Sequence, residues 1–160
     1  MRILGIDPAL KITGYGLIEF NSGIISLLKA GAIITSAREL LPLRLNKIYE
    51  AVLKLILSSR PNVMVLEKLF VHYHHPTTAY LLGEARGIIC LACAKGNIPL
   101  IEYSATRVKK AIVGRGSASK EQVQKMVLSM LNLKDLPKYA DVTDAVALAI
   151  SYSNIIRARQ

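Results

Sequence analysis

The order of apolar runs along the chain constrains its fold more than any other sequence feature. Three strand-like runs come first, over residues 2–7, 15–20 and 24–34, and a tight-turn signal, Asn-Ser-Gly, precedes the third. Helical and strand-like patterns then alternate: we expect helices over 37–59 and 77–95, strands over 63–67 and 98–102, and final helices over 104–113, 119–131 and 140–156. An antiparallel meander followed by such alternation predicts an α/β fold, a five-stranded mixed sheet flanked by helices, in a single domain over 1–160.

Acidic residues stand where two of these strands end. Asp7 closes the first apolar run and Glu67 closes the fourth. If those two strands are parallel neighbours, both carboxylates lie at the same edge, where open sheets present their ligands. Asp141 and Asp144 are spaced i, i+3, so they point from one face of the last helix. Docking of that helix beside the strand ends would gather all four carboxylates.

Taken singly, these acids have ordinary explanations. Asp7 before Pro8 fits a turn, Glu67 fits a strand-end charge, and Asp141 suits the start of a helix. Asp144 differs, because the residues after it are apolar and an unpaired carboxylate there is costly. Two carboxylates about 4 Å apart repel by roughly 4 kcal/mol at an effective dielectric near 20. A cluster of four is therefore tolerated when a cation neutralises it, and hard Mg²⁺ or Mn²⁺ are the cations that oxygen ligands favour.

The charge balance points to a polyanionic partner. Lys and Arg number 21 against 11 acidic residues, and six of the basic residues fall between Arg107 and Lys125, with Glu121 as the acidic exception. A solvated helix face is the competing interpretation of that segment. A membrane surface is disfavoured, because the sequence has no run of about 18 apolar residues and no signal-peptide pattern. We therefore expect a cytoplasmic protein that acts on nucleic acid.

Several segments, in order and at matching spacing over about residues 1–153, resemble the RuvC-type Holliday junction resolvases (crossover junction endodeoxyribonucleases). The segments are Gly5-Ile6-Asp7-Pro8, Leu66-Glu67 with Phe70 beyond, Gly83-Glu84-Ala85-Arg86-Gly87, Val108-Lys109-Lys110, Gly114 to Lys120, and Asp141-Val142-Thr143-Asp144-Ala145. The resemblance implies a ribonuclease H-like fold and a homodimer that nicks two opposed strands of a four-way DNA junction in recombination and repair. It also implies Mg²⁺, two ions per subunit with Mn²⁺ as a substitute, and products with 5′-phosphate and 3′-hydroxyl ends.

The resemblance assigns roles to individual residues. Asp7, Glu67, Asp141 and Asp144 would be metal ligands and catalytic residues, and Lys120 would neutralise charge on the phosphate. The expected DNA contacts are Phe70, Lys109, Arg115 and Lys120. Arg115 is included because its glycine-flanked segment suits a phosphate, although a plain turn suits it equally. Helix 77–95, apolar on most sides, is our candidate for the dimer contact, with burial in the monomer core as the competing view.

The chain departs from the family pattern in two places. Ala9 stands where a glycine is usual, and the stretch from Val71 to Thr78 carries His72, His74 and His75 in an unusual loop. These departures put sequence preference in question more than chemistry. The alternative function is another ribonuclease H-like nuclease, acting on structured RNA or a different DNA branch. An actin-like ATP-binding module and a non-catalytic nucleic-acid binder fit less well, and docking of a branch-migration motor complex is left open.

Overall fold

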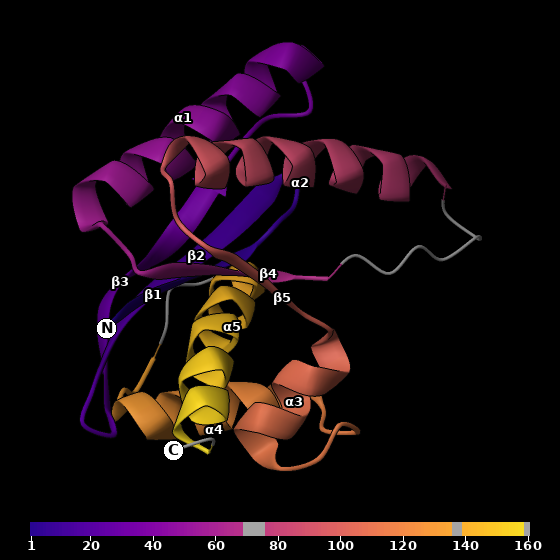
Figure 1. Cartoon of the computed structure of the whole chain (residues 1–160). Helices are drawn as coiled ribbons and strands as arrows, with labels where there is room; N and C mark the ends of the chain where they lie inside the picture. The colour runs from indigo at the N-terminus through magenta and orange to yellow at the C-terminus, as the bar shows by residue number, and fades with distance from the viewer. Residues whose placement is uncertain (69–75, 136–138, 159–160) are drawn as a thin grey trace.

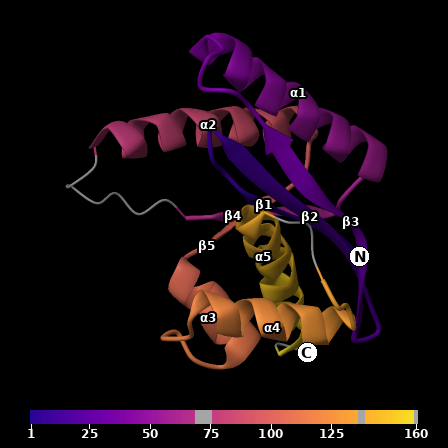
Figure 2. The same cartoon turned by 180° about the vertical axis from the view of Figure 1, so that it is seen from behind.

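The computed structural model describes residues 1–68, 76–135 and 139–158, which form a five-stranded sheet with helices on both faces (Figure 1). The strands are β1 (Arg2–Asp7), β2 (Ile12–Asn21), β3 (Ile24–Ile34), β4 (Val63–Glu67) and β5 (Leu100–Tyr103). The helices are α1 (Leu41–Ser59), α2 (Pro76–Lys95), α3 (Ala105–Val113), α4 (Lys120–Leu131) and α5 (Ala140–Arg157). Seen from either side, α1 and α2 cover one face of the sheet and α3, α4 and α5 lie on the other (Figure 2).

The sheet has the order β3-β2-β1-β4-β5. The first three strands form the predicted antiparallel meander, and β4 and β5 add to β1 in parallel. The predicted five-stranded mixed sheet is therefore confirmed. In particular, β1 and β4 are parallel neighbours, and their register ends at the pair Ile6 and Leu66.

Some predicted boundaries were wrong. Helix α1 begins at Leu41 instead of residue 37, because a proline occupies its first turn and the Glu39 carboxylate accepts a hydrogen bond from the Ser36 N–H at 3.0 Å in a separate turn. Strand β2 begins three residues before the predicted start, since Ile12 pairs with Ile34 at the far end of β3. Strand β5 begins at Leu100, the first residue in register with β4.

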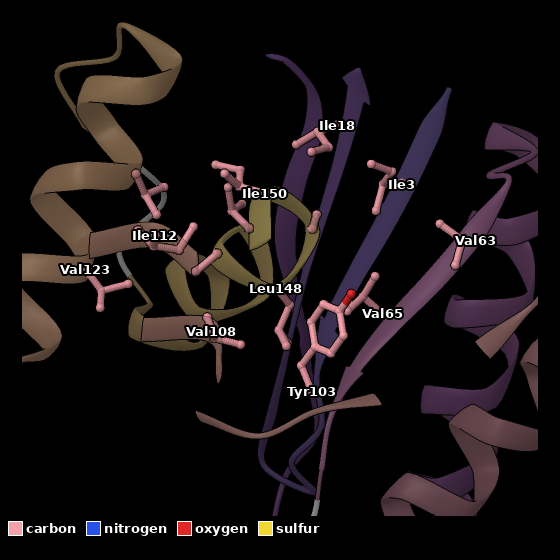
Figure 3. Packing of buried hydrophobic residues seen from close by; sticks show 14 of the residues in the cluster. Ile3, Ile18, Val63, Val65, Tyr103, Val108, Ile112, Val123, Leu148 and Ile150 are labelled. Atoms are coloured by element: carbon pink, nitrogen blue, oxygen red, sulfur yellow. The ribbon is translucent and has the colours of Figure 1, made fainter. Parts of the chain in front are cut away.

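Alternation along β1 and β4 divides their side chains between two cores. Ile3, Val63 and Val65 pack with α3, α4 and α5 (Figure 3), whereas Leu4 and Met64 pack with α1 and α2. Because successive strand residues point to opposite faces, the last residue of each strand shares a face with the residue two positions earlier. The side chains of the two strand-end carboxylates are therefore directed to the face covered by α5.

Helix α2 is buried along one face only. Ala85, Ile89, Ala92 and Cys93 pack onto the sheet. On its outer side Tyr80 is 64% exposed, and a Cβ added at Gly83 or Gly87 would meet no atom within 4 Å. Burial in the monomer core and a dimer contact, the two interpretations of this helix, are thus compatible, because burial of one face leaves the other face open. None of the helices in the described ranges is long and apolar enough to cross a membrane.

Candidate active site

The carboxyl ends of β1 and β4 bring Asp7 and Glu67 together. The parallel register pairs the residues immediately before them, Ile6 and Leu66, so the two carboxylates leave adjacent strands at the same edge. Both side chains are partly buried, since the α5 layer covers this face of the sheet. The sequence-based expectation that these two strand ends converge is confirmed.

Glycines on β1 and β2 allow α5 to lie directly on the sheet. A Cβ at Gly14, the β2 partner of Asp7, would lie 2.0 Å from the Asp141 carbonyl oxygen. A Cβ at Gly5 would lie 2.0 Å from the Ala145 carbonyl oxygen. Side-chain carbons do not approach backbone atoms so closely, so any other residue would push the helix away. Asp144 lies in the turn of α5 between these two contacts, which explains why the first turns of the helix reach Asp7.

The two strand-end carboxylates, Asp7 and Glu67, are affected by burial and by the charges around them. Burial raises the pKa of Asp7 to about 8, and the nearby charges of Glu67, Asp144 and Asp141 add to the rise. The pKa of Glu67 is raised as well, first by burial and then by the charge of Asp144. Without a cation, this cluster therefore holds a proton at neutral pH in place of its full negative charge.

Lys120 is the basic residue that contacts the cluster. It is the first residue of α4, and its Nζ lies 3.1 Å from Asp144 Oδ2. That hydrogen bond and the Asp144 charge raise the pKa of Lys120. The Ser119–Gln122 capping box fixes the start of α4, as the sequence predicts. It therefore also fixes the position of the Lys120 backbone, from which the side chain extends. Because the Lys120 side chain is 76% exposed, the ammonium is free to exchange its partner.

A hollow beside the cluster joins the acidic and basic residues. Its lining includes the acidic residues Glu67 and Asp144 and the basic residues Lys109 and Lys120. Its remaining walls are apolar, formed by Ala105, Val108, Val123, Ala147 and Leu148. The structure therefore brings Lys109 to the acidic site from α3, a helix that the sequence alone does not place.

Arg115, another expected DNA contact, does not line this hollow. It is exposed in the turn between α3 and α4. Phe70, His72, His74 and His75 lie outside the described residues, so the expectations for them stay predictions.

The carboxylates suit a hard metal ion in chemistry and charge, although they do not yet enclose one. Within residues 1–68, 76–135 and 139–158, no three His, Cys, Asp or Glu side chains are arranged as a ready metal cage. Burial and the neighbouring carboxylates nevertheless raise the pKa of Asp7, and the opposing charge of Lys120, hydrogen-bonded to Asp144, does not offset this rise. Oxygen ligands with unneutralised charge are what Mg²⁺ and Mn²⁺ bind. The donor set therefore fits such an ion.

Three residues important to this geometry had no role in the sequence-based interpretation. Gly14 and Gly16 are two positions apart on β2, so they share a face of the sheet. Glycines within a strand indicate that another backbone approaches closely, and the sequence does contain this signal. Arg86 belongs to a segment that resembles the family, but nothing in its sequence context indicates that it contacts the Glu67 carbonyl.

A mixed sheet with this strand order, with carboxylates at the ends of β1 and β4 and on a helix crossing them, defines the ribonuclease H-like class of nucleases. The sequence model of the family "Crossover junction endodeoxyribonuclease RuvC" matches residues 3–152. The Crossover junction endodeoxyribonuclease RuvC of Brevibacillus brevis is 42% identical over 153 residues, which cover 96% of this chain and 92% of that protein. The chain belongs to the RuvC family.

Solved structures agree with this assignment. Thermus thermophilus RuvC superposes with a TM-score of 0.89 at 30% identity, covering 99% of this chain and 97% of that one. The structure of T. thermophilus RuvC in complex with Holliday junction substrate gives the same TM-score at 28% identity, covering 99% and 96%. These similarities extend over almost the whole of both chains.

Proposed function

We propose that this chain is a structure-selective endonuclease that resolves four-way (Holliday) DNA junctions by paired symmetric nicks in recombination and repair. The observation that carries the proposal is the convergence of Asp7, Glu67 and the α5 carboxylates beside Lys109 and Lys120. An acidic cluster alone fits many metal nucleases. Membership of the RuvC family, and the Holliday junction substrate bound by the T. thermophilus relative, favour junction DNA.

The proposed cofactor is Mg²⁺, two ions per subunit, with Mn²⁺ as a substitute. Asp7, Glu67, Asp141 and Asp144 would hold it. Bound there, the metal would supply an acidified water and neutralise charge on the scissile phosphodiester, whose hydrolysis leaves 5′-phosphate and 3′-hydroxyl ends. As a metal ligand Asp7 would be deprotonated, so metal binding would release the proton that its raised pKa retains.

Two lysines complete the proposed site. Lys120 bonds to Asp144 in the structure, and its exposed ammonium could exchange this partner for a phosphate oxygen if Asp144 held a metal ion. Lys109, which also lines the hollow, binds a phosphate of the same strand. The apolar walls of the hollow keep water away from this end of the site.

We also propose a homodimer, because one site cuts one strand and a junction needs two matched cuts. The outer face of α2 supports this proposal. Gly83 and Gly87 leave its backbone open to a close partner, and Tyr80 and Leu91 expose apolar surface beside them, with Leu91 47% exposed.

Cleavage of different substrates tests the proposal directly. We expect paired symmetric nicks in a mobile four-way DNA junction with Mg²⁺ or Mn²⁺, and no cutting of linear duplex or RNA–DNA hybrid. The measurement is denaturing electrophoresis of junctions labelled on each strand in turn. Cutting of hybrid or structured RNA instead would contradict the proposal and favour the alternative, another ribonuclease H-like nuclease.

Replacing Lys109 with Ala should weaken junction binding to the same extent for every junction sequence, because a phosphate contact reads no bases. We expect a several-fold rise in Kd and a salt slope that falls by about 1. Titrations by fluorescence anisotropy at several salt concentrations measure both quantities. Lys54→Ala, which removes an exposed lysine from α1 on the opposite side of the sheet, is the matched control. An unchanged salt slope for Lys109→Ala would remove this residue from the phosphate contacts.

A further inference from the structure

Arg86 reaches Glu67 from the side of the sheet opposite the carboxylates. It belongs to α2, and its side chain is only 13% exposed. One guanidinium nitrogen donates a hydrogen bond to the backbone carbonyl of Glu67, and another forms an ion pair with the Glu102 carboxylate on β5. The guanidinium is therefore held at two points, which is the geometry that arginine provides and lysine does not.

The backbone at Glu67 depends on this contact. The Lys68 N–H bonds to the Tyr103 carbonyl on β5 at 2.8 Å. In a trans peptide the N–H and the preceding C=O point in opposite directions, so the Glu67 carbonyl is directed away from β5. On that side the register with β1 already ends at Ile6 and Leu66. Arg86 supplies a donor to this carbonyl where the strand pairing stops.

We propose that Arg86 is a positioning residue for the nuclease reaction, which fixes the carbonyl of Glu67 and thereby holds the Glu67 carboxylate in place to bind metal. Glu102 orients Arg86 for this task. The inference rests on the proposed function for its role in cutting, but its prediction for metal binding does not require a junction substrate. Partners that orient metal ligands are typically worth about 10- to 100-fold in metal affinity or activity.

Arg2 offers a matched control within the same fold. It too donates to a backbone carbonyl, that of Ser59 at 2.9 Å, and pairs with a carboxylate, that of Glu19 at 3.5 Å. It stands at the amino end of β1, the strand whose other end carries Asp7. Loss of Arg2 therefore removes a comparable set of contacts at the opposite end of the strand from the site.

The experiment measures Mn²⁺ binding by calorimetry without DNA, together with junction Kd and single-turnover cleavage. We expect Arg86→Met to weaken Mn²⁺ binding and slow cleavage by about tenfold or more, with junction Kd within about twofold of wild type. Arg2→Met should leave all three unchanged. Arg86→Lys should recover part of the loss, because it donates to the carbonyl but cannot also pair with Glu102 in the same geometry.

A double-mutant cycle with Glu67→Gln separates positioning from general stability. If Arg86 acts through Glu67, Arg86→Met adds no further loss of Mn²⁺ affinity in the Glu67→Gln background. Additive losses, or wild-type Mn²⁺ affinity in folded Arg86→Met, would overturn the proposal. Should Arg86→Met not fold, Arg86→Lys and Glu102→Gln decide the question, and wild-type metal binding and cutting in both would overturn it equally. If the wild-type protein cuts no junction while the cycle still shows coupling, the proposed function fails and the positioning role stands.

Discussion

Replacing Asp7 with Asn should abolish junction cutting and at the same time stabilise the metal-free protein. Burial, and after it the charges of neighbouring carboxylates, raises the pKa of Asp7 to about 8, so its ionised form is disfavoured in the folded metal-free protein. The amide is uncharged, so it removes a repulsion that the folded protein otherwise suffers. It is also a poor ligand for a hard cation, so we expect cleavage to fall by about three orders of magnitude, equivalent to about 4 kcal/mol.

The stabilisation should depend on pH with a definite sign. Asp7 ionises near pH 4 in the unfolded chain and near pH 8 in the folded one, so between these values the folded state binds more protons. Stability of the metal-free wild type should therefore fall as pH rises through this window, and the fall should be complete above about pH 8. Asp7→Asn has no carboxyl group that titrates at this position, so its stability should fall less over the same pH range.

Thermal unfolding measured from pH 5 to 8.5, with and without Mg²⁺, checks both effects. At pH 8 without metal we expect the Tm of Asp7→Asn to exceed that of wild type by about 5 °C, corresponding to about 2 kcal/mol. Millimolar Mg²⁺ should raise the Tm of wild type and leave that of Asp7→Asn almost unchanged. Asp135→Asn, which neutralises an exposed aspartate outside the cluster, should behave as wild type. An equal rise in Tm with Mg²⁺ for Asp7→Asn would argue against a metal site at this residue.

Much of this site was predictable because strand ends and helix faces are local properties. The apolar runs before Asp7 and Glu67 locate both carboxylates at strand ends, and the i, i+3 spacing puts Asp141 and Asp144 on one helix face. The distance between these groups depends on contacts remote in sequence. The approach of α5 to the sheet is set by Gly14, more than 120 positions before Asp141 in the chain.

The sequence predicts the surroundings of the helix faces less well than the positions of the strand ends. A pattern apolar on most sides predicts burial of α2, yet its small residues include Gly83 and Gly87, which leave one face open. Likewise, the basic residues of α3 and α4 read as a solvated face or as a DNA contact. Only the packing of both helices against α5 directs Lys109 and Lys120 to the same hollow. Arg86 shows the same limit, because its partner is a backbone carbonyl and carries no side-chain signal.

Replacing Gly14 with Ala should impair both stability and cutting, although the change adds only a single methyl group. The new Cβ would lie 2.0 Å from the Asp141 carbonyl oxygen and 2.3 Å from its carbonyl carbon. Both are backbone atoms of α5, so no side chain can rotate away and the helix itself must shift. Overpacking of this kind costs about 1–3 kcal/mol, and a displacement near 1 Å in a catalytic group can cost about 100-fold in rate.

Single-turnover cleavage and thermal unfolding of Gly14→Ala measure these two losses, and Gly31→Ala is the matched control. A Cβ at Gly31, on β3, would meet the Tyr15 hydroxyl oxygen at 2.5 Å, but that is the far end of a side chain that can move. Gly31→Ala should therefore keep nearly all activity. Because Gly14 pairs with Asp7 on β1 and also lies against the backbone of Asp141, its substitution should also weaken Mn²⁺ binding. Normal metal affinity and normal cutting in Gly14→Ala would show that α5 can move without disturbing the carboxylates, and would contradict a site whose geometry is set by close packing of this helix.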